Sequence, residues 1–122
     1  MPRAIDNQIY FYYKEVAMSG DSLGRFEHFI LLAVIRLGEE AYGMTIRREL
    51  AEHTGRDVAV GAIYTALARL ERRRLVQSWL GQPTAERGGK AKRHYRVLAD
   101  GKTALAKAEA ALNGLAGDPR RA

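Results

Sequence analysis

Cysteine is absent from this 122-residue chain, and no continuous apolar run is long enough to cross a bilayer. The absence of cysteine excludes disulfide bonds, thiol catalysis and cysteine-ligated metals. The absence of a long apolar run argues against a membrane-spanning helix. The N-terminus also lacks the apolar core and small-residue cleavage site of a signal peptide. We therefore expect a cytoplasmic protein with no membrane partner.

Catalytic and cofactor-binding motifs are missing as well. Neither a G-x-G-x-x-G motif nor a P-loop occurs. The adjacent carboxylates Glu39 and Glu40 are neighbours on a loop, where side chains diverge and cannot share acid–base work. The three histidines, His28, His53 and His94, fall in different expected elements and lack the i, i+4 spacing of metal-binding pairs. We expect no catalytic residue, no metal, no cofactor and no enzymatic activity.

What the chain does have is a concentrated positive charge. Its formal net charge is +6, and residues 69–96 alone hold nine basic and two acidic residues, a net of +7. The flanking ranges 1–68 and 97–122 carry net charges of −2 and +1. With 47% hydrophobic and 28% charged residues, the chain has the composition of one globular domain. A basic block at one place on such a domain suits a docked polyanion.

The basic block begins on a stretch, VAVGAIYTALARLERRRLV, that predicts a helix over residues 58–74 with two different faces. Apolar residues recur at spacings of three and four, as on a helix that lies on a core: Val60, Ile63, Leu67 and Leu70. The opposite face combines small residues, threonine and arginine: Gly61, Thr65, Ala68, Arg69 and Arg72. Small residues allow close approach to base edges, and threonine and arginine hydrogen-bond to bases and phosphates. The alternative is an ordinary amphipathic helix with a solvated basic side.

Two helices are expected before this one. Ser22 is a plausible N-cap for a first helix that reaches Leu37, and Gly38 supplies its stop. The wide apolar stripe of this helix predicts that it is mostly buried. A second helix opens at 41–43 and runs to about Thr54. Three helices with short connections are the layout of a helix-turn-helix domain.

After Leu75 the pattern changes to that of a β-hairpin. Residues 76–80 and 94–98 are rich in aromatic and branched side chains, and a loop with glycine, proline and charges joins them. A hairpin directly after a helix-turn-helix makes a winged helix. The wing is expected to carry four basic residues to the phosphate backbone: Arg87, Lys90, Lys92 and Arg93.

From Ala99 the chain becomes an alanine-rich helix with a narrow apolar seam: Leu105, Ala108, Leu112 and Leu115. The helix can pack on its own domain or pair with a second copy, and we favour pairing because operator readers are usually two-fold dimers. We divide the chain into an N-terminal arm or extension (1–20), a winged-helix DNA-binding domain (21–98), a dimerisation helix (99–117) and a tail (118–122). Whether 1–17 precede a natural start at Met18 is left open.

Three segments of this chain resemble the PadR family of bacterial winged-helix transcriptional regulators, over about residues 23–115. They are AYG-x-x-I at 41–46, Gly-x-x-Tyr-x-x-Leu-x-x-Leu at 61–70, and the wing sequence ERGG-basic-Tyr that ends at Tyr95. The resemblance implies a homodimeric, non-enzymatic regulator of double-stranded DNA, often a repressor released by a small molecule. It also implies a bacterial, nucleoid-associated protein.

The resemblance also assigns residues. Tyr64 and Thr65 match recognition-helix positions that face DNA, and Lys90, Lys92 and Arg93 match the basic wing. The complete set of expected DNA-binding residues is Tyr42, Gly61, Tyr64, Thr65, Ala68, Arg69, Arg72, Arg87, Lys90, Lys92 and Arg93. In dimers of this family an aromatic residue near the interface can stack on a planar effector. Trp79 is the candidate here, although a half-buried packing role is the more common one for a strand tryptophan.

Two positions depart from the family pattern. Arg74 stands where the family commonly has glycine, which predicts a strained or more helical turn. Leu98-Ala99 replaces a common Thr-Pro, which removes a helix cap worth about 1 kcal/mol.

The expected fold is therefore mainly α (α+β), a winged helix-turn-helix with a C-terminal dimerisation helix. The expected function is sequence-specific binding to a palindromic operator by a homodimeric repressor. The alternative is a winged-helix module that binds RNA or a protein partner and uses the basic block for general electrostatics.

Overall fold

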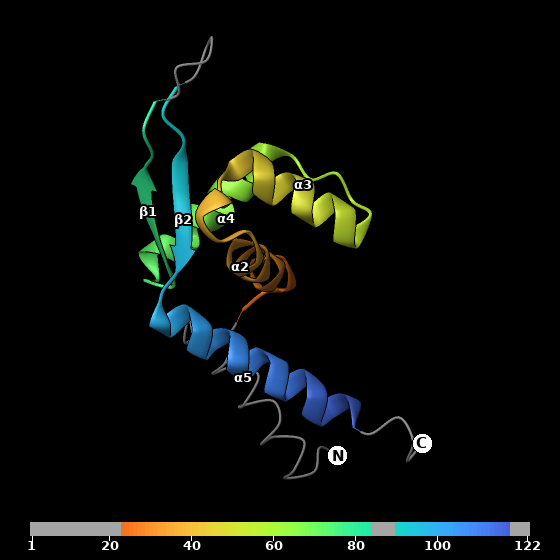
Figure 1. The fold of residues 1–122 in the computed structure, drawn as a ribbon. Coiled ribbons are helices and arrows are strands. Elements are labelled where there is room, and N and C mark those ends of the chain that lie inside the picture. The colour runs from red at the N-terminus through yellow and green to blue at the C-terminus, as the bar shows by residue number, and fades with distance from the viewer. Residues whose placement is uncertain (1–22, 84–89, 118–122) are drawn as a thin grey trace.

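The computed structural model describes residues 23–83 and 90–117 (Figure 1). In chain order, its elements are helix α2 (Arg25–Leu37), the short 3-10 helix η1 (Gly38–Glu40), α3 (Gly43–Thr54), α4 (Val60–Arg72), strands β1 (Val76–Leu80) and β2 (Arg93–Val97), and α5 (Ala99–Ala116). Helices α2, α3 and α4 pack together, the hairpin stands beside them, and α5 lies at the end of the hairpin where β1 begins and β2 ends (Figure 1). The predicted winged-helix fold is confirmed.

The helix boundaries follow the local sequence closely. Gly38 and Gly55 end α2 and α3 with positive φ angles of 59° and 72°, a conformation that glycine adopts without steric cost. The expected N-cap Ser22 lies outside the described residues. The helix begins at Arg25 with Gly24 as its N-cap, and Glu27 Oε1 accepts a hydrogen bond from the Gly24 N–H at 3.2 Å.

The hydrophobic core lies where the three helices meet the hairpin. Its largest fully buried side chains come from all of these elements: Ile30, Leu31, Val34, Ile46, Ile63, Leu67, Leu70 and Val76. Near its edge, Arg73 Nη1 lies 3.4 Å from Glu27 Oε2, and both side chains are largely buried. This ion pair ties the end of α4 to the start of α2, which helps to fix the helix that carries the basic block.

The hairpin is an antiparallel pair in which Val76 faces Val97 and Leu80 faces Arg93. β1 has the predicted bounds, whereas β2 begins one residue earlier than predicted, at Arg93. An isolated bridge joins His94 to Tyr42, and the Tyr95 N–H donates to the Ala41 carbonyl at 3.0 Å. The hairpin is therefore anchored to the segment just before α3.

The structure shows the local geometry at both departures from the family pattern. Arg74 has a φ of 61°, the left-handed conformation that non-glycine residues adopt only at a cost of about 1–2 kcal/mol. Helix α5 starts after Leu98, which makes no side-chain capping hydrogen bond. The turn after α4 is thus strained, and the first turn of α5 lacks the usual side-chain cap.

The first half of α5 packs on its own domain. A β-carbon at Gly101 would collide with the Leu75 carbonyl oxygen, so this glycine allows the helix to lie directly on the backbone before β1. Leu105 is buried in the core, whereas Leu112 and Leu115 are 59% and 80% exposed. Among the described residues, no helix is long and apolar enough to span a membrane.

Candidate nucleic-acid interface

Helix α4 has the two faces that its sequence predicts. Its buried side consists of Ile63, Ala66, Leu67 and Leu70. Every residue predicted for the opposite side is exposed: Gly61, Thr65, Ala68, Arg69 and Arg72. Val60, predicted on the apolar stripe, is only half-buried because it opens the helix. The solvent-exposed face of α4 therefore carries small side chains, with arginines towards its C-terminal end.

Thr65 has one hydrogen bond within its own helix. Its hydroxyl donates to the Gly61 carbonyl at 2.9 Å, and the side chain remains exposed. A hydroxyl oxygen that donates in this way still has lone pairs that can accept a hydrogen bond. Thr65 can therefore accept from a base amino group while its rotamer stays fixed by the helix.

Lys92 at the base of the wing is held by Tyr42. Its Nζ donates to Tyr42 Oη at 3.3 Å and lies 4.3 Å from the centre of the Tyr42 ring. Lys90 is also exposed, whereas Arg87 lies outside the described residues. The structure thus brings Tyr42 and Lys92 together, two residues that the sequence placed in the same interface without predicting their contact.

Arg93 belongs to a polar chain that the sequence reasoning missed. Its Nη1 donates to Ser78 Oγ at 3.0 Å, and the Ser78 hydroxyl donates to Glu71 Oε1 at 2.7 Å. Strand alternation could have placed Arg93 and Ser78 on one face of the hairpin. The link to Glu71 on α4 depends on tertiary packing. This polar chain connects the hairpin to the C-terminal end of α4 and partly compensates the charge of Arg93.

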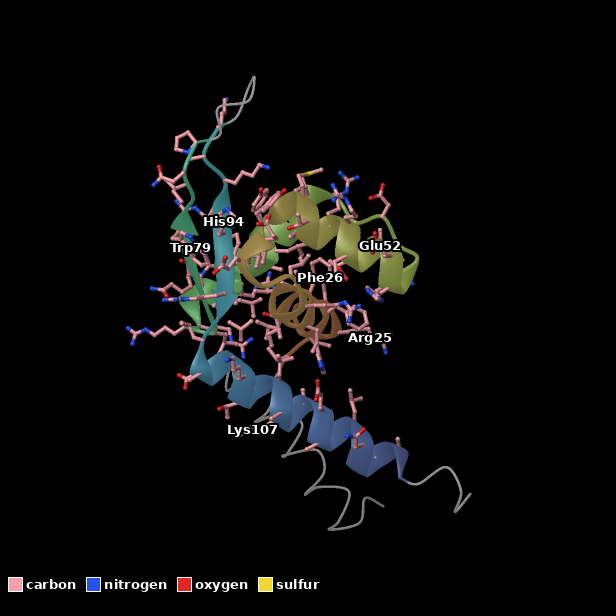
Figure 2. The ribbon with its side chains drawn as sticks, in the orientation of Figure 1. Arg25, Phe26, Glu52, Trp79, His94 and Lys107 are labelled. Carbon is pink, nitrogen blue, oxygen red and sulfur yellow. The ribbon has the colours of Figure 1, made fainter. Side chains whose placement is uncertain are left out.

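On the other face of the hairpin, Trp79 stacks on His94, with ring centroids 5.6 Å apart and planes 21° apart (Figure 2). His94 also meets the Tyr42 ring edge-on at 5.5 Å, and its Nδ1 lies 2.8 Å from the Glu39 carbonyl oxygen. Trp79 is 38% exposed. One face of the indole is therefore already paired with a ring of the same protein.

Tyr95 is a buried residue of strand β2. Burial raises the pKa of its phenol, nearby Arg93 opposes that rise, and the negative charge of Glu71 and the phenol of Tyr64 add to it. Because the pKa lies above that of a free tyrosine, the hydroxyl is neutral at physiological pH. Tyr95 thus contributes a neutral, buried contact and no charge to this surface.

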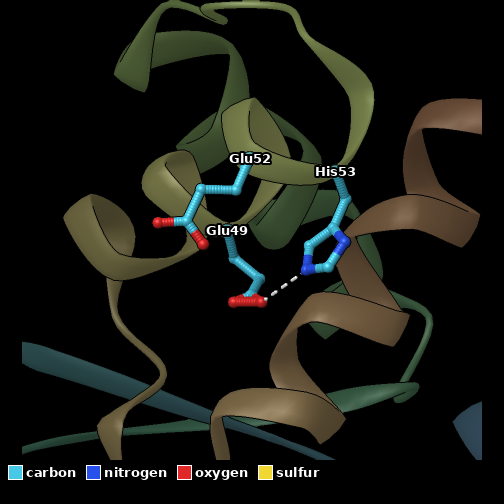
Figure 3. A group of neighbouring side chains, drawn as sticks. All are labelled: Glu49, Glu52 and His53. Carbon is cyan, nitrogen blue, oxygen red and sulfur yellow. Dashed lines mark hydrogen bonds and ion pairs between the residues drawn. The ribbon is translucent and has the colours of Figure 1, made fainter.

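A second group of polar side chains lies on α3, away from the wing (Figure 3). The ligand atoms of Glu49, Glu52 and His53 lie within 4.8 Å of one another, and His53 Nε2 is 3.0 Å from Glu49 Oε1. The spacing of the three histidines alone does not reveal this i, i+4 pair of a glutamate and a histidine. Arg36 Nε donates to the same Glu49 oxygen at 2.9 Å. A guanidinium at that position opposes cation binding, so we assign no metal to these residues.

Glu49, His53 and Arg36 also border an apolar groove of about 590 Å³ between α2 and α3. Its apolar lining includes the exposed outer side of α2: Phe29, Leu32 and Ile35. These side chains point away from the core, so α2 has apolar residues on two sides. The sequence reasoning treated this helix as mostly buried, which is wrong for its outer side.

Comparison with known families gives a match over most of the described core. Residues 31–107 match the model of the transcriptional regulator PadR-like family. This range contains α3, α4, the hairpin and the first half of α5. No curated protein is similar in sequence at a significant level.

Solved structures of PadR-type regulators have the same fold. A PadR-like transcription factor from Bacteroides fragilis is 25% identical, with a TM-score of 0.60, and the match covers 74% of this chain and 82% of that one. A PadR family regulator from Clostridium difficile R20291 is 26% identical, with a TM-score of 0.57 and coverage of 72% and 88%. One from Eggerthella lenta DSM 2243 is 25% identical, with a TM-score of 0.59 and coverage of 93% and 89%.

Proposed function

The chain belongs to the PadR-like family of transcriptional regulators, and from that membership we propose that it is a homodimeric repressor that reads a palindromic operator. A PadR-like regulator is a DNA-binding protein and not an enzyme. The proposal concerns the finer points: which residues read the DNA, how two copies associate, and what releases them.

The observation that carries the proposal is the exposed face of α4. We assign base contacts to Thr65 and Arg69 and close approach to the groove to Gly61 and Ala68, because these residues share one exposed side of a helix whose other side is buried. Arg72, further along the same face, is assigned to a phosphate. A helix with this division is supported rigidly from behind, as a reader of base edges requires.

We assign phosphate contacts to the wing. Lys90 and Lys92 are exposed cations at the base of the loop between β1 and β2, and Arg87 within that loop is assigned to the same role from sequence. Arg93 is assigned with them, although its hydrogen bond to Ser78 holds its guanidinium close to the sheet. Tyr42 and Tyr64 complete the proposed surface between the wing and α4.

We propose that the second half of α5 forms the dimer. Leu105 is occupied in its own core and Ala108 is half-buried, so the part of the seam that remains for a partner is Leu112 and Leu115. Leu112 and Leu115 are neighbours on the helix surface, and contiguous exposed apolar patches commonly mark protein–protein interaction sites. The exposed outer side of α2, with Phe29, Leu32 and Ile35, offers further apolar area for the same interface.

We propose that Trp79 contacts a small planar effector. Its indole is partly exposed, and Arg96 lies 5.8 Å from its ring centre. It is the one tryptophan of the chain, so its fluorescence reports directly on this position. Quenching or a spectral shift with an aromatic compound that also lowers DNA affinity would support the assignment.

The division of the chain proposed from sequence agrees with this scheme: an arm or extension at 1–20, the DNA-binding domain at 21–98, the dimerisation helix at 99–117 and a tail at 118–122. We also propose that the protein acts in the bacterial cytoplasm, on the nucleoid, since its target is chromosomal DNA.

The decisive experiment is selection of bound sites by the full chain from a random duplex library. The expected result is a palindrome whose half-sites lie about 34–36 Å apart, the separation of successive major grooves on one side of DNA. Light scattering of the free protein and of the complex should give two chains per duplex. Enrichment of no duplex, with retention of RNA or a protein instead, would refute the operator-reading function.

A further inference from the structure

Gly43, the first residue of α3, is a glycine with no conformational reason to be one. It is buried, and its φ is not among the positive values found in the described residues. Alanine is the better helix former at a position with ordinary helical angles. The reason for glycine must therefore lie in the space that a side chain would occupy.

That space is filled by Tyr64 from the recognition helix. A β-carbon built on Gly43 would overlap the Tyr64 hydroxyl oxygen and would lie 2.5 Å from Cζ and 3.0 Å from Cε1 of the same ring. Tyr64 is 44% exposed, so its ring lies on the surface with its tip seated on the first turn of α3. The three atoms nearest to that β-carbon position all belong to Tyr64.

The residues around this contact connect it to the wing. Tyr42, next to Gly43, forms the isolated bridge with His94 and holds Lys92 through its hydroxyl. The Tyr42 N–H is in turn fixed by Thr45 Oγ1 at 3.0 Å. The Gly43–Tyr64 contact thus lies at the corner where α3, α4 and the wing meet.

We propose that Gly43 is a positioning residue for DNA reading: by having no side chain, it holds the Tyr64 ring against α3 and so fixes the direction of this side chain beside the groove-facing residues of α4. The proposal rests on the DNA-reading function assigned to α4. It gives one shared role to Gly43 and Tyr64, which are 21 positions apart in the sequence but in contact in the fold.

The obvious variant should fold. In Gly43→Ala the colliding atoms belong to the end of an exposed side chain, and Tyr64 can turn into solvent without opening the core. Alanine also favours the helix. We expect an unchanged or slightly higher melting temperature together with a loss of DNA discrimination, a combination that simple destabilisation cannot produce.

The test is a double-mutant cycle with Gly43→Ala, Tyr64→Ala and the double variant, in the full chain. Binding is measured to the duplex selected by the wild type and to a shuffled duplex. The readout is the discrimination ratio, the dissociation constant for the shuffled duplex divided by that for the selected duplex. We expect each single variant to lower that ratio about tenfold and the double variant to lower it no further, since both remove one positioned contact. Thr103→Ala, at an exposed position in the first half of α5 outside the proposed DNA and dimer surfaces, is the control.

Two results would overturn the proposal. One is a ratio of dissociation constants that is unchanged in Gly43→Ala but lowered in Tyr64→Ala. This result would show that Tyr64 reads DNA without its contact to Gly43. The other is a double variant whose loss equals the product of the single losses, which would show that Gly43 acts independently of Tyr64. A wild type that prefers no duplex would refute DNA reading itself, and with it any positioning role of Gly43.

Discussion

Lys92 and Tyr42 form a cation–π pair and a hydrogen bond at the same time: the ammonium lies 4.3 Å from the ring centre, and Nζ donates to the hydroxyl at 3.3 Å. Tyr42 immediately precedes α3, and Lys92 precedes β2. The pair thus holds one basic wing residue in a defined position before DNA arrives. A preorganised contact loses less side-chain entropy on binding.

The first prediction concerns the wing and the salt dependence of DNA binding. Replacing Lys90 and Lys92 by alanine should weaken binding to all duplexes alike and reduce the slope of log K against log salt by up to about 1.8, since each lost phosphate contact removes about 0.9. Fluorescence anisotropy over a salt series measures the slope. Lys102→Ala with Lys107→Ala removes the same charge from the exposed side of α5 and should leave the slope nearly unchanged. Equal slopes for both pairs would show that the wing lies outside the interface.

The exposed face of α4 makes the second prediction, which concerns discrimination. Thr65→Ala or Arg69→Ala should reduce the preference for the selected duplex over single-base variants by about 1–3 kcal/mol at the contacted position, with a smaller effect on non-specific affinity. Competition titrations with a set of single-base variants measure this. Thr103→Ala, an exposed threonine on α5, is the control. A uniform loss across all sequences would instead assign these residues to phosphates.

The exposed leucines of α5 make the third prediction, which concerns assembly. Leu112→Asp with Leu115→Asp should give a monomer whose operator affinity is lower by about 10²–10⁴, the contribution that joining two binding units typically makes. Light scattering measures the mass, and Thr103→Asp with Ala106→Asp is the control, because it adds the same two charges at exposed positions in the first half of the helix. A dimer in the leucine variant would place the interface elsewhere. Truncation after Leu98 is unsuitable because it would also remove Leu105 from the core.

The fourth prediction concerns Arg74 and the stability of the fold. Because its φ of 61° is strained for any residue with a β-carbon, Arg74→Gly should raise the free energy of unfolding by about 0.5–1 kcal/mol, after the greater entropy of glycine in the unfolded chain is subtracted. The melting temperature should rise by about 2–4 °C. Arg74→Ala removes the same charge but keeps the β-carbon and should show no such gain. If the alanine variant gains as much as the glycine variant, then charge repulsion, and not backbone strain, destabilises the turn.

Much of the fold could be predicted because local patterns were unambiguous. The strand at 76–80 is bounded by a helix-ending turn and a glycine, and α3 ends before Gly55, whose positive φ is a common helix stop. The start of α2 was predicted less well. Ser22 is the better capping residue by type, but Glu27 pairs with the backbone three residues before it, so the cap is Gly24.

The sequence predicts which side of α4 is exposed, but it does not predict which side chains of the candidate site contact one another. The spacing of residues along α4 determines which side is solvent-exposed, so Thr65 and Arg69 could be named from periodicity alone. The contacts of Lys92 with Tyr42 and of Tyr64 with Gly43 join residues 50 and 21 positions apart. No local period encodes such pairs, because they depend on how the hairpin and α4 dock on α3. For the same reason, Leu105 was expected at a dimer seam and is found in the core.

Gly101 has a consequence for how the distance between two DNA-reading helices could change in evolution. Since α5 rests directly on the Leu75 carbonyl, it leaves the domain at a fixed angle, and in the proposed dimer the length of α5 would set the distance between the two copies of α4. One inserted residue between Leu105 and Leu112 would lengthen the helix by about 1.5 Å but rotate the distal leucines by about 100°. Seven inserted residues would add about 10.5 Å with almost no net rotation. Relatives that read more widely separated half-sites should therefore differ from this chain by whole heptads in α5.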